Sequence, residues 1–209
     1  MEEVLATYAL PVDPAIPLVC FDESGKELRD HVREPLPGPP VREDPEYVRQ
    51  GSANLFLTYA PHLGWRHVAV TTQRTAVDFA LAMRELVDLH FPGAPRIIVV
   101  LDNLNTHCFG SLYTTLPPAE ARRIVARLDF RFTPKHGSWL NMAELELSVL
   151  ARQCLDRRMP DQAMLQEEVT AWAAARNAVA APAQWTFSVD DARIRLTHLY
   201  PIPVCDSST

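Results

Sequence analysis

The pattern of hydrophobic and polar positions predicts a central buried strand at residues 97–101. Five residues in a row there are Ile, Val or Leu. A run this short and this apolar is typical of a strand that is buried on both faces in the middle of an α/β sheet. Asp102 follows directly, at the strand end where open α/β sheets place their ligands. The first candidate for chemistry therefore lies at this strand end.

A second apolar segment, residues 18–21, predicts another strand that ends in a carboxylate. Asp22 follows it, and Ser24–Gly25 is expected to form a turn. Residues 1–17 carry three prolines and are expected to form an arm that leads into this strand. Residues 28–47 carry five prolines and are expected to form a long irregular loop.

Later segments continue as an alternation of strands and helices. Residues 53–59 and 66–72 predict two adjacent strands joined by a turn at 61–64, and residues 130–133 predict a further short strand. Helices are expected where apolar residues recur at helical spacing. These helices are residues 75–90, 116–128, 140–155, 161–179 and 190–199. The order predicts an α/β fold with a mixed sheet of five strands, paired as hairpins at its start and in parallel later.

Composition limits the class of protein. Of the 209 residues, 47% are hydrophobic and 22% are charged, which is enough apolar content for a packed core. No apolar run approaches the ~20 residues of a membrane span, and no secretory signal is visible at the N-terminus. The four cysteines show no C-x-x-C pairing, which argues against a zinc cage and for reduced thiols in the cytoplasm.

Charge gives a mixed indication about nucleic acid as a partner. The net charge of −6 on its own argues against it. Arginines nevertheless gather at residues 122–131 and 152–158, and Lys135 lies just beyond the first stretch. A general bias of the source genome towards arginine is the simpler explanation, but the local clusters remain available for contacts with phosphate.

The two strand-end carboxylates, Asp22 and Asp102, are expected to lie close together if their strands are neighbours. Two such charges repel, and each would have a raised pKa unless a cation lies between them. Mg²⁺ is the natural cation because it prefers oxygen ligands and is usually held by one or two carboxylates plus substrate phosphates. A third carboxylate from the helix at 140–155 would complete a two-metal site for phosphodiester cleavage.

Each of these residues also has a purely structural explanation. Asp22 could belong to a turn, and Asp102 could form an Asx turn at its strand end. Glu144 could be the third residue of a capping box that Asn141 begins. The remaining polar candidates could be ordinary loop residues, and these are His107, Lys135 and His136.

Helical periodicity leaves two choices for the third carboxylate. At 100° per residue, Glu144 and Glu146 fall on opposite borders of the buried stripe of their helix, roughly 160° apart. They therefore cannot both face one metal pair. Glu144 is favoured because it lies in the first turn, nearest the loop at 134–139, and Glu146 is then a structural or solvated carboxylate.

Two motifs together resemble one known family. DNLNTH at residues 102–107, followed by TPKHGSWLNMAE at 133–144, is similar to the catalytic domain of the DDE transposases. The likeness is greatest to the bacterial insertion-sequence relatives of mariner, the insertion sequence 630 group. It covers nearly the whole chain, from LVCFDES at 18–24 to DARIRLTHLYP at 191–201.

The resemblance implies a fold and a set of site residues. The fold would be ribonuclease-H-like, with helices on both faces of the sheet and further helices at the C-terminus. We expect an N-terminal arm at 1–16, a catalytic core at 17–158 and a helical extension packed on it at 159–209. The resemblance implies Mg²⁺ or Mn²⁺ in a two-metal site, with Asp22, Asp102 and Glu144 as catalytic metal ligands. It also implies residues that support these ligands or bind DNA, namely Asn103, His107, Lys135, His136, Trp139 and Asn141.

The resemblance further implies transposition as the activity and DNA as the partner. Such an enzyme would cut a phosphodiester at the ends of an insertion sequence and join the freed 3′-hydroxyl to target DNA, typically at a TA dinucleotide. Full-length members carry an N-terminal helix-turn-helix region that this sequence does not show. We therefore expect a truncated frame, an excised domain or a second frame joined by frameshifting, with a homodimer and a separate helix-turn-helix segment as further partners, in the cytoplasm at the nucleoid. An inactive remnant that acts as a binding module, and a ribonuclease-H-like nuclease or resolvase, remain the alternatives.

Overall fold

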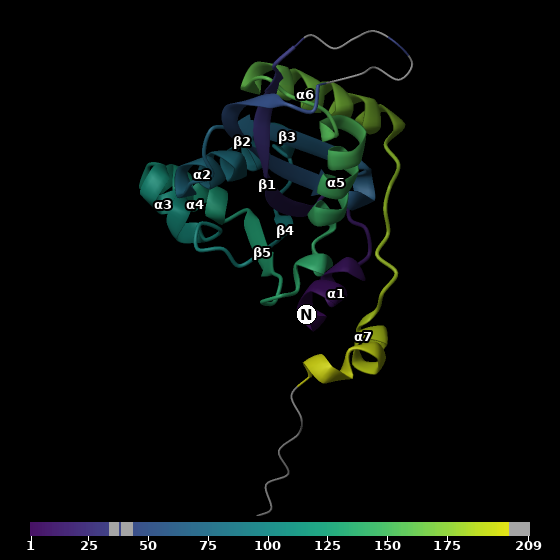
Figure 1. Cartoon of the computed structure of the whole chain (residues 1–209). Coiled ribbons are helices and arrows are strands. Elements are labelled where there is room, and N and C mark those ends of the chain that lie inside the picture. Colours follow the sequence, from purple (N-terminus) through teal and green to yellow (C-terminus); the bar gives the residue numbers. More distant parts are fainter. Residues whose placement is uncertain (34–37, 39–43, 201–209) are drawn as a thin grey trace, which may run out of the picture.

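A mixed five-stranded sheet forms the centre of the protein (Figure 1). The computed structural model describes residues 1–33, 38 and 44–200. The sheet has the order β3-β2-β1-β4-β5, in which β1, β2 and β3 are antiparallel and β1, β4 and β5 are parallel. The predicted mixed sheet is confirmed. Its strands are β1 (Leu18–His31), β2 (Tyr47–Ala60), β3 (Trp65–Thr71), β4 (Ile97–Leu101) and β5 (Leu128–Phe132).

The first strand is much longer than its apolar start suggests. The predicted turn at Ser24–Gly25 is wrong, because these residues pair with Leu55 and Asn54 inside the β1–β2 ladder. The predicted loop at 28–47 is also wrong at its two ends, since His31 still pairs with Tyr47. Its prolines at 35, 37, 39 and 40 lie outside the described residues.

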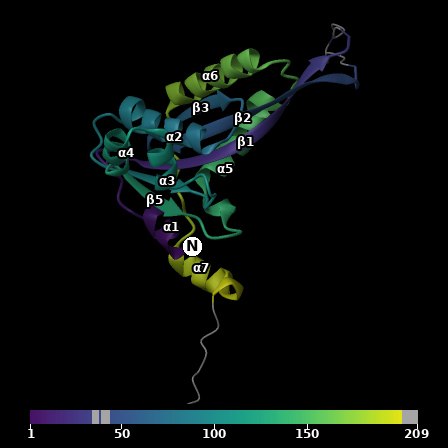
Figure 2. The same ribbon diagram turned by 90° about the vertical axis from the view of Figure 1, so that its left-hand side faces the viewer.

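The far half of β1 and β2 is a two-stranded arm that extends beyond the helices (Figure 2). Both strands are mostly polar there, and Glu27 on β1 forms an ion pair of 2.8 Å with Arg49 on β2. Because such an arm is open to solvent, it lacks the apolar residues by which a strand is recognised in a sequence. The pattern of apolar residues therefore predicts an end of β1 that lies too early in the chain.

One face of the sheet is covered by helices that follow β3 and β4. They are α2 (Ala76–Glu85), the π-helix η2 (Leu86–His90), α3 (Phe109–Thr115) and α4 (Pro118–Val125). Phe21 of β1 packs here against Phe79 of α2. The predicted helix at 75–90 is confirmed, and Thr75 begins it with a capping box to Asp78. α3 was not predicted, because its sequence FGSLYTT shows little helical periodicity.

The opposite face is covered by helices from both ends of the chain. The N-terminal segment that was expected to form an arm contains a helix that was not predicted, α1, whose Val4, Leu5 and Tyr8 belong to the core of this face. In the described part of the chain no helix is long and apolar enough to cross a membrane. The helices of this face are α1 (Glu2–Tyr8), α5 (Met142–Leu150), the π-helix η4 (Ala151–Leu155), α6 (Gln162–Val179) and α7 (Val189–Arg195). Short 3₁₀ turns lie at η1 (Pro61–Leu63), η3 (Ser138–Leu140) and η5 (Thr197–Leu199).

Helix α6 also covers the edge of the sheet at β3. The side chain of Asn177 accepts a hydrogen bond from the Arg66 backbone N–H (2.9 Å) and donates one to the Arg66 carbonyl (2.8 Å). Gln166 accepts a hydrogen bond from the backbone N–H of Val70 (3.1 Å). These amides occupy backbone groups that an exposed edge strand would otherwise offer to another chain.

Candidate active site

Two of the predicted carboxylates lie at equivalent positions of neighbouring parallel strands. Cys20 of β1 is paired with Val100 of β4, and Asp22 and Asp102 each follow two residues later. Because side chains alternate along a strand, both carboxylates extend from the face on which Cys20 and Val100 pack. Asp102 ends β4 as predicted, whereas Asp22 lies inside β1, where it is paired with Leu57 of β2.

The third predicted carboxylate, Glu144, lies in the first turn of α5, which packs on this same face. Glu144 and Asp102 both act on Asp22, as the pKa of Asp22 shows. Burial is the main cause that raises this pKa to about 7, and the charges of Glu144 and Asp102 raise it further. A hydrogen bond from the Glu23 backbone N–H to Asp22 Oδ1 (2.8 Å) acts in the opposite direction. The fold therefore places three acidic residues from β1, β4 and α5 within electrostatic reach of each other.

The capping-box explanation of Glu144 is not supported by the backbone contacts. Asn141 does cap α5, but its side-chain oxygen accepts from the N–H of Ala143 (3.1 Å). The backbone N–H of Asn141, which a capping box would bond to Glu144, donates instead to the carbonyl of Ser138 (2.7 Å). The carboxylate of Glu144 is therefore not used to cap its own helix.

Asn141 also fixes α5 to the strand that carries Asp22. Its Nδ2 donates a hydrogen bond to the carbonyl of Phe21 (2.8 Å), and its side chain is buried. Tyr8 of α1 supports the same point, because its hydroxyl donates to the carbonyl of Leu140 (2.7 Å) and accepts from the N–H of Met142 (3.3 Å). Asn141 thus positions the start of α5, and its burial rules it out as a direct contact to DNA. Tyr8 was not among the predicted site residues, because the N-terminal segment was expected to form an arm that leads into β1.

His107 holds the second carboxylate. Its Nδ1 lies 2.5 Å from Asp102 Oδ1, and its Nε2 lies 3.9 Å from Glu23 Oε2. Burial lowers the pKa of the imidazole, but the two carboxylates outweigh this effect and raise the pKa to about 9. The ring packs against Phe21 and Phe79 and is buried, so it supports Asp102 and does not reach a phosphate.

Glu23 was missed as part of this arrangement. It follows Asp22 in β1 and therefore extends from the other face of the sheet, on the side of α2. There it lies between His107 and Arg74, whose Nη1 is 3.6 Å from Glu23 Oε1. Strand alternation in the sequence FDES could have placed it opposite Asp22, had β1 been recognised as continuing.

The loop between β5 and α5 forms one wall of a cleft beside Asp102. The cleft has a volume of about 340 Å³ and includes Asn103, Lys135 and His136, all of which are exposed. His136 adopts a left-handed backbone (φ 63°), and a Cβ at Gly137 would lie 2.6 Å from a side-chain carbon of Pro134. This part of the loop is therefore closely fitted around the turn that presents Lys135 and His136.

Trp139 lies on the other side of this loop. It stacks on Trp185 with ring centroids 6.4 Å apart and contacts Phe187 at 6.0 Å. With Lys135 and His136 it lines a second hollow of about 230 Å³. Its side chain stays 39% exposed, so it remains accessible from solvent.

Glu146 lies apart from the three carboxylates. It is buried, with its Oε1 2.7 Å from Arg66 Nε and 2.8 Å from Arg176 Nε. This carboxylate is committed to two cations of the protein itself, which agrees with the structural part predicted for it.

The ligand atoms of the three acidic residues are not drawn into one tight group. In the part of the chain that the structure describes, the one set of three or more His, Cys, Asp or Glu with ligand atoms within 4.8 Å of one another is His67, Glu85 and His90. Asp22, Asp102 and Glu144 present oxygen atoms only, which suits a hard cation such as Mg²⁺ or Mn²⁺. Burial and the charges of Glu144 and Asp102 raise the pKa of Asp22, and a cation there would offset both effects.

Comparison with known proteins identifies the family and the fold. Residues 17–166 match the family model described as DDE superfamily endonuclease. No curated protein matches the chain. Among solved structures, the crystal structure of the Mos1 mariner paired end complex with Mn is similar, with a TM-score of 0.57 and 16% sequence identity. The match covers 86% of this chain but only 56% of that chain, and it confirms the ribonuclease-H-like fold.

Proposed function

Because the chain belongs to the DDE superfamily of endonucleases, we propose that it is the catalytic domain of a transposase that cleaves DNA phosphodiester bonds with the help of a divalent metal ion. The observation that carries this proposal is the meeting of Asp22, Asp102 and Glu144, from three separate elements, on one face of the sheet. The motifs DNLNTH and TPKHGSWLNMAE favour the insertion sequence 630 group within this superfamily.

The proposed metal ligands are these three carboxylates, which fit Mg²⁺ or Mn²⁺ in a two-metal site. When bound, such ions lower the pKa of a water molecule and neutralise charge on the phosphate oxygens. His107 keeps Asp102 in place, and Asn141 sets the position of Glu144 relative to Asp22. Neither of these two residues needs to touch the substrate.

The proposed DNA contacts lie around the cleft beside Asp102. Lys135 and His136 are exposed there, and the Lys135 ammonium suits a phosphate oxygen. In the proposed reaction, water attacks phosphorus and the 3′-oxygen of the cut strand leaves with a proton. The freed 3′-hydroxyl then attacks a phosphodiester of target DNA in the same manner, at a TA dinucleotide.

Further partners are proposed from the resemblance. They are a helix-turn-helix segment, which would recognise the element ends, and a second copy of the chain in a homodimer. The site of action would be the nucleoid in the bacterial cytoplasm. The domain limits proposed are an arm at 1–16, a core at 17–158 and an extension at 159–209.

The main alternative is a remnant that has kept the fold as a binding module. The charges of Glu144 and Asp102, which act on the largely buried Asp22, argue for an active enzyme, because a remnant gains no stability from carboxylates that repel one another. A ribonuclease or resolvase on the same fold is less favoured, since the TPKHGSWLN segment is similar to transposases.

A nicking assay on supercoiled plasmid DNA tests the proposal. The wild-type protein should nick the plasmid with Mg²⁺ or Mn²⁺ and not with EDTA. Asp22→Asn and Asp102→Asn should each lose this activity, whereas Asp190→Asn, whose side chain is 86% exposed on α7, should retain it. Metal-independent nicking, or equal activity in Asp102→Asn, would show that these carboxylates are not the active site.

A further inference from the structure

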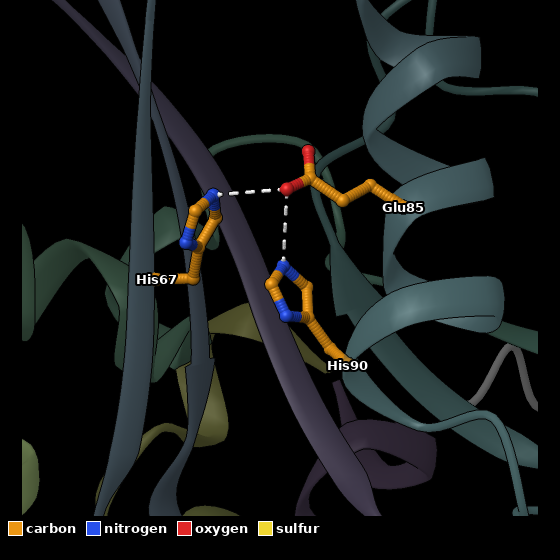
Figure 3. Close-up of side chains that lie close together, drawn as sticks. All are labelled: His67, Glu85 and His90. Atoms are coloured by element: carbon orange, nitrogen blue, oxygen red, sulfur yellow. Dashed lines mark ion pairs between the residues drawn. The ribbon is translucent and has the colours of Figure 1, made fainter.

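Three metal-ligating side chains meet at the edge of the sheet, on the face opposite Asp22. His67 extends from β3, Glu85 ends α2, and His90 ends η2 (Figure 3). One ligand atom from each lies within 4.8 Å of the other two. His67 is on the side of the sheet covered by α2, together with Trp65 and Ala69, so this group is separated from the carboxylate site by the sheet itself.

The contacts within this group are not hydrogen bonds. Nε2 of His67 and Nε2 of His90 each lie 3.5 Å from the same oxygen, Oε1 of Glu85 (Figure 3). His90 Nε2 is buried and has no hydrogen-bond partner. A buried polar atom without a partner costs free energy, so three ligand atoms that converge without bonding call for a common partner.

The surroundings hold the two imidazoles in fixed orientations. The ring of Trp65 lies 4.8 Å from the His90 ring and 6.5 Å from that of His67. Neutral imidazole is the form that binds metal, and packing that fixes the rings reduces the cost of assembling the site.

We propose that His67, Glu85 and His90 bind a Zn²⁺ ion. Two imidazole nitrogens and one carboxylate oxygen are a ligand set that zinc uses when its fourth position is open. Ligand atoms at about 2.0–2.1 Å around a tetrahedral ion are about 3.4 Å apart, and the two His–Glu separations of 3.5 Å are close to this value. A groove of about 270 Å³ that includes His67 and His90 adjoins the group.

The bound ion would join a strand of the sheet to the helix that follows it in the chain. β3 is the edge strand, and α2 with η2 covers the face beside it. An ion that binds only the folded chain shifts the folding equilibrium towards that state. This site differs from the proposed catalytic site in chemistry as well as in place, because nitrogen ligands select zinc or cobalt over Mg²⁺.

The test uses the whole chain with Zn²⁺ and Co²⁺ as probes. The variant Asp22→Asn/Asp102→Asn is included so that the carboxylate site contributes no binding. We expect one Zn²⁺ per chain by calorimetry in both proteins, intense visible d–d bands with Co²⁺, and a melting temperature that Zn²⁺ raises and Mg²⁺ does not. His67→Gln and Glu85→Gln should bind at least tenfold more weakly, and His198→Gln, at an exposed histidine, should bind as wild type.

The outcomes that overturn the proposal are separate from those of the nicking assay. If the wild type binds no Zn²⁺, the proposal is wrong and the two histidines form only ion pairs with Glu85. Unchanged binding by both His67→Gln and Glu85→Gln, or its loss in the double Asn variant, would place the ion elsewhere. Glu85 is 37% exposed, so Glu85→Gln is expected to fold, and its melting curve without metal shows whether it does.

Discussion

The two acidic residues of α5, Glu144 and Glu146, show how differently one helix can use the same side chain. Glu144 lies near two other carboxylates and contributes to the raised pKa of Asp22. Glu146 lies between Arg66 and Arg176, which neutralise it within the protein. The charge of Glu144 is unfavourable there unless a cation binds, whereas the charge of Glu146 is already balanced by the two arginines. The difference separates the carboxylate that we propose as a metal ligand from one that is paired within the fold.

The largest effect is expected from Glu144→Gln on activity. This change should abolish metal-dependent nicking, because it removes a proposed metal ligand without changing the size of the side chain. The melting temperature should stay within a few degrees of wild type or rise slightly, since a charge that repels Asp22 is lost. Nicking rates and thermal melting of the same preparations measure both effects. Normal nicking by Glu144→Gln would show that Glu144 is not a metal ligand and does not differ from Glu146 in this respect.

Glu146→Gln should have the opposite profile. Arg66 is only 2% exposed, so removing its partner leaves a buried charge unpaired, at a cost of about 3–5 kcal/mol in the free energy of unfolding. Urea denaturation measures this loss, and the nicking rate per folded molecule should be unchanged. A double variant, Arg66→Met/Glu146→Leu, should lose less stability than Glu146→Gln, because it removes both buried charges together. An unchanged free energy of unfolding in Glu146→Gln would mean that these ion pairs contribute nothing to stability.

A smaller loss of stability than at Glu146 is expected at Asn141, which links Glu144 to β1. Asn141→Ala removes the helix cap and should cost about 1 kcal/mol in the free energy of unfolding. Asn141→Ser keeps a capping oxygen but is too short to donate to the Phe21 carbonyl. Compared with Asn141→Ala, it should therefore regain the stability that the cap provides but not the nicking activity. A fall in kcat with little change in KM in both variants would identify a positioning residue. Full nicking by Asn141→Ser would show that the cap alone matters.

Much of the fold follows from local sequence patterns. The run at 97–101 is a fully buried strand as predicted, and the periodic segment at 75–90 is helical. These predictions succeeded because burial on both faces, or on one helical stripe, leaves its period in the sequence. The limits of β1 and the existence of α1 were not predictable in this way, since a solvated arm and a short seven-residue helix have weak patterns.

The sequence by itself determined the strand-end position of Asp102, the order of the five strands along the chain and the motifs that place the chain in its superfamily. It also narrowed the third carboxylate to two residues, because their separation around a helix is a local property. Only the tertiary structure showed that Glu146 is held by two arginines and that His67 meets Glu85 and His90. Those contacts depend on strand register and on how helices pack across the sheet, and neither is recorded in the spacing of residues along one element.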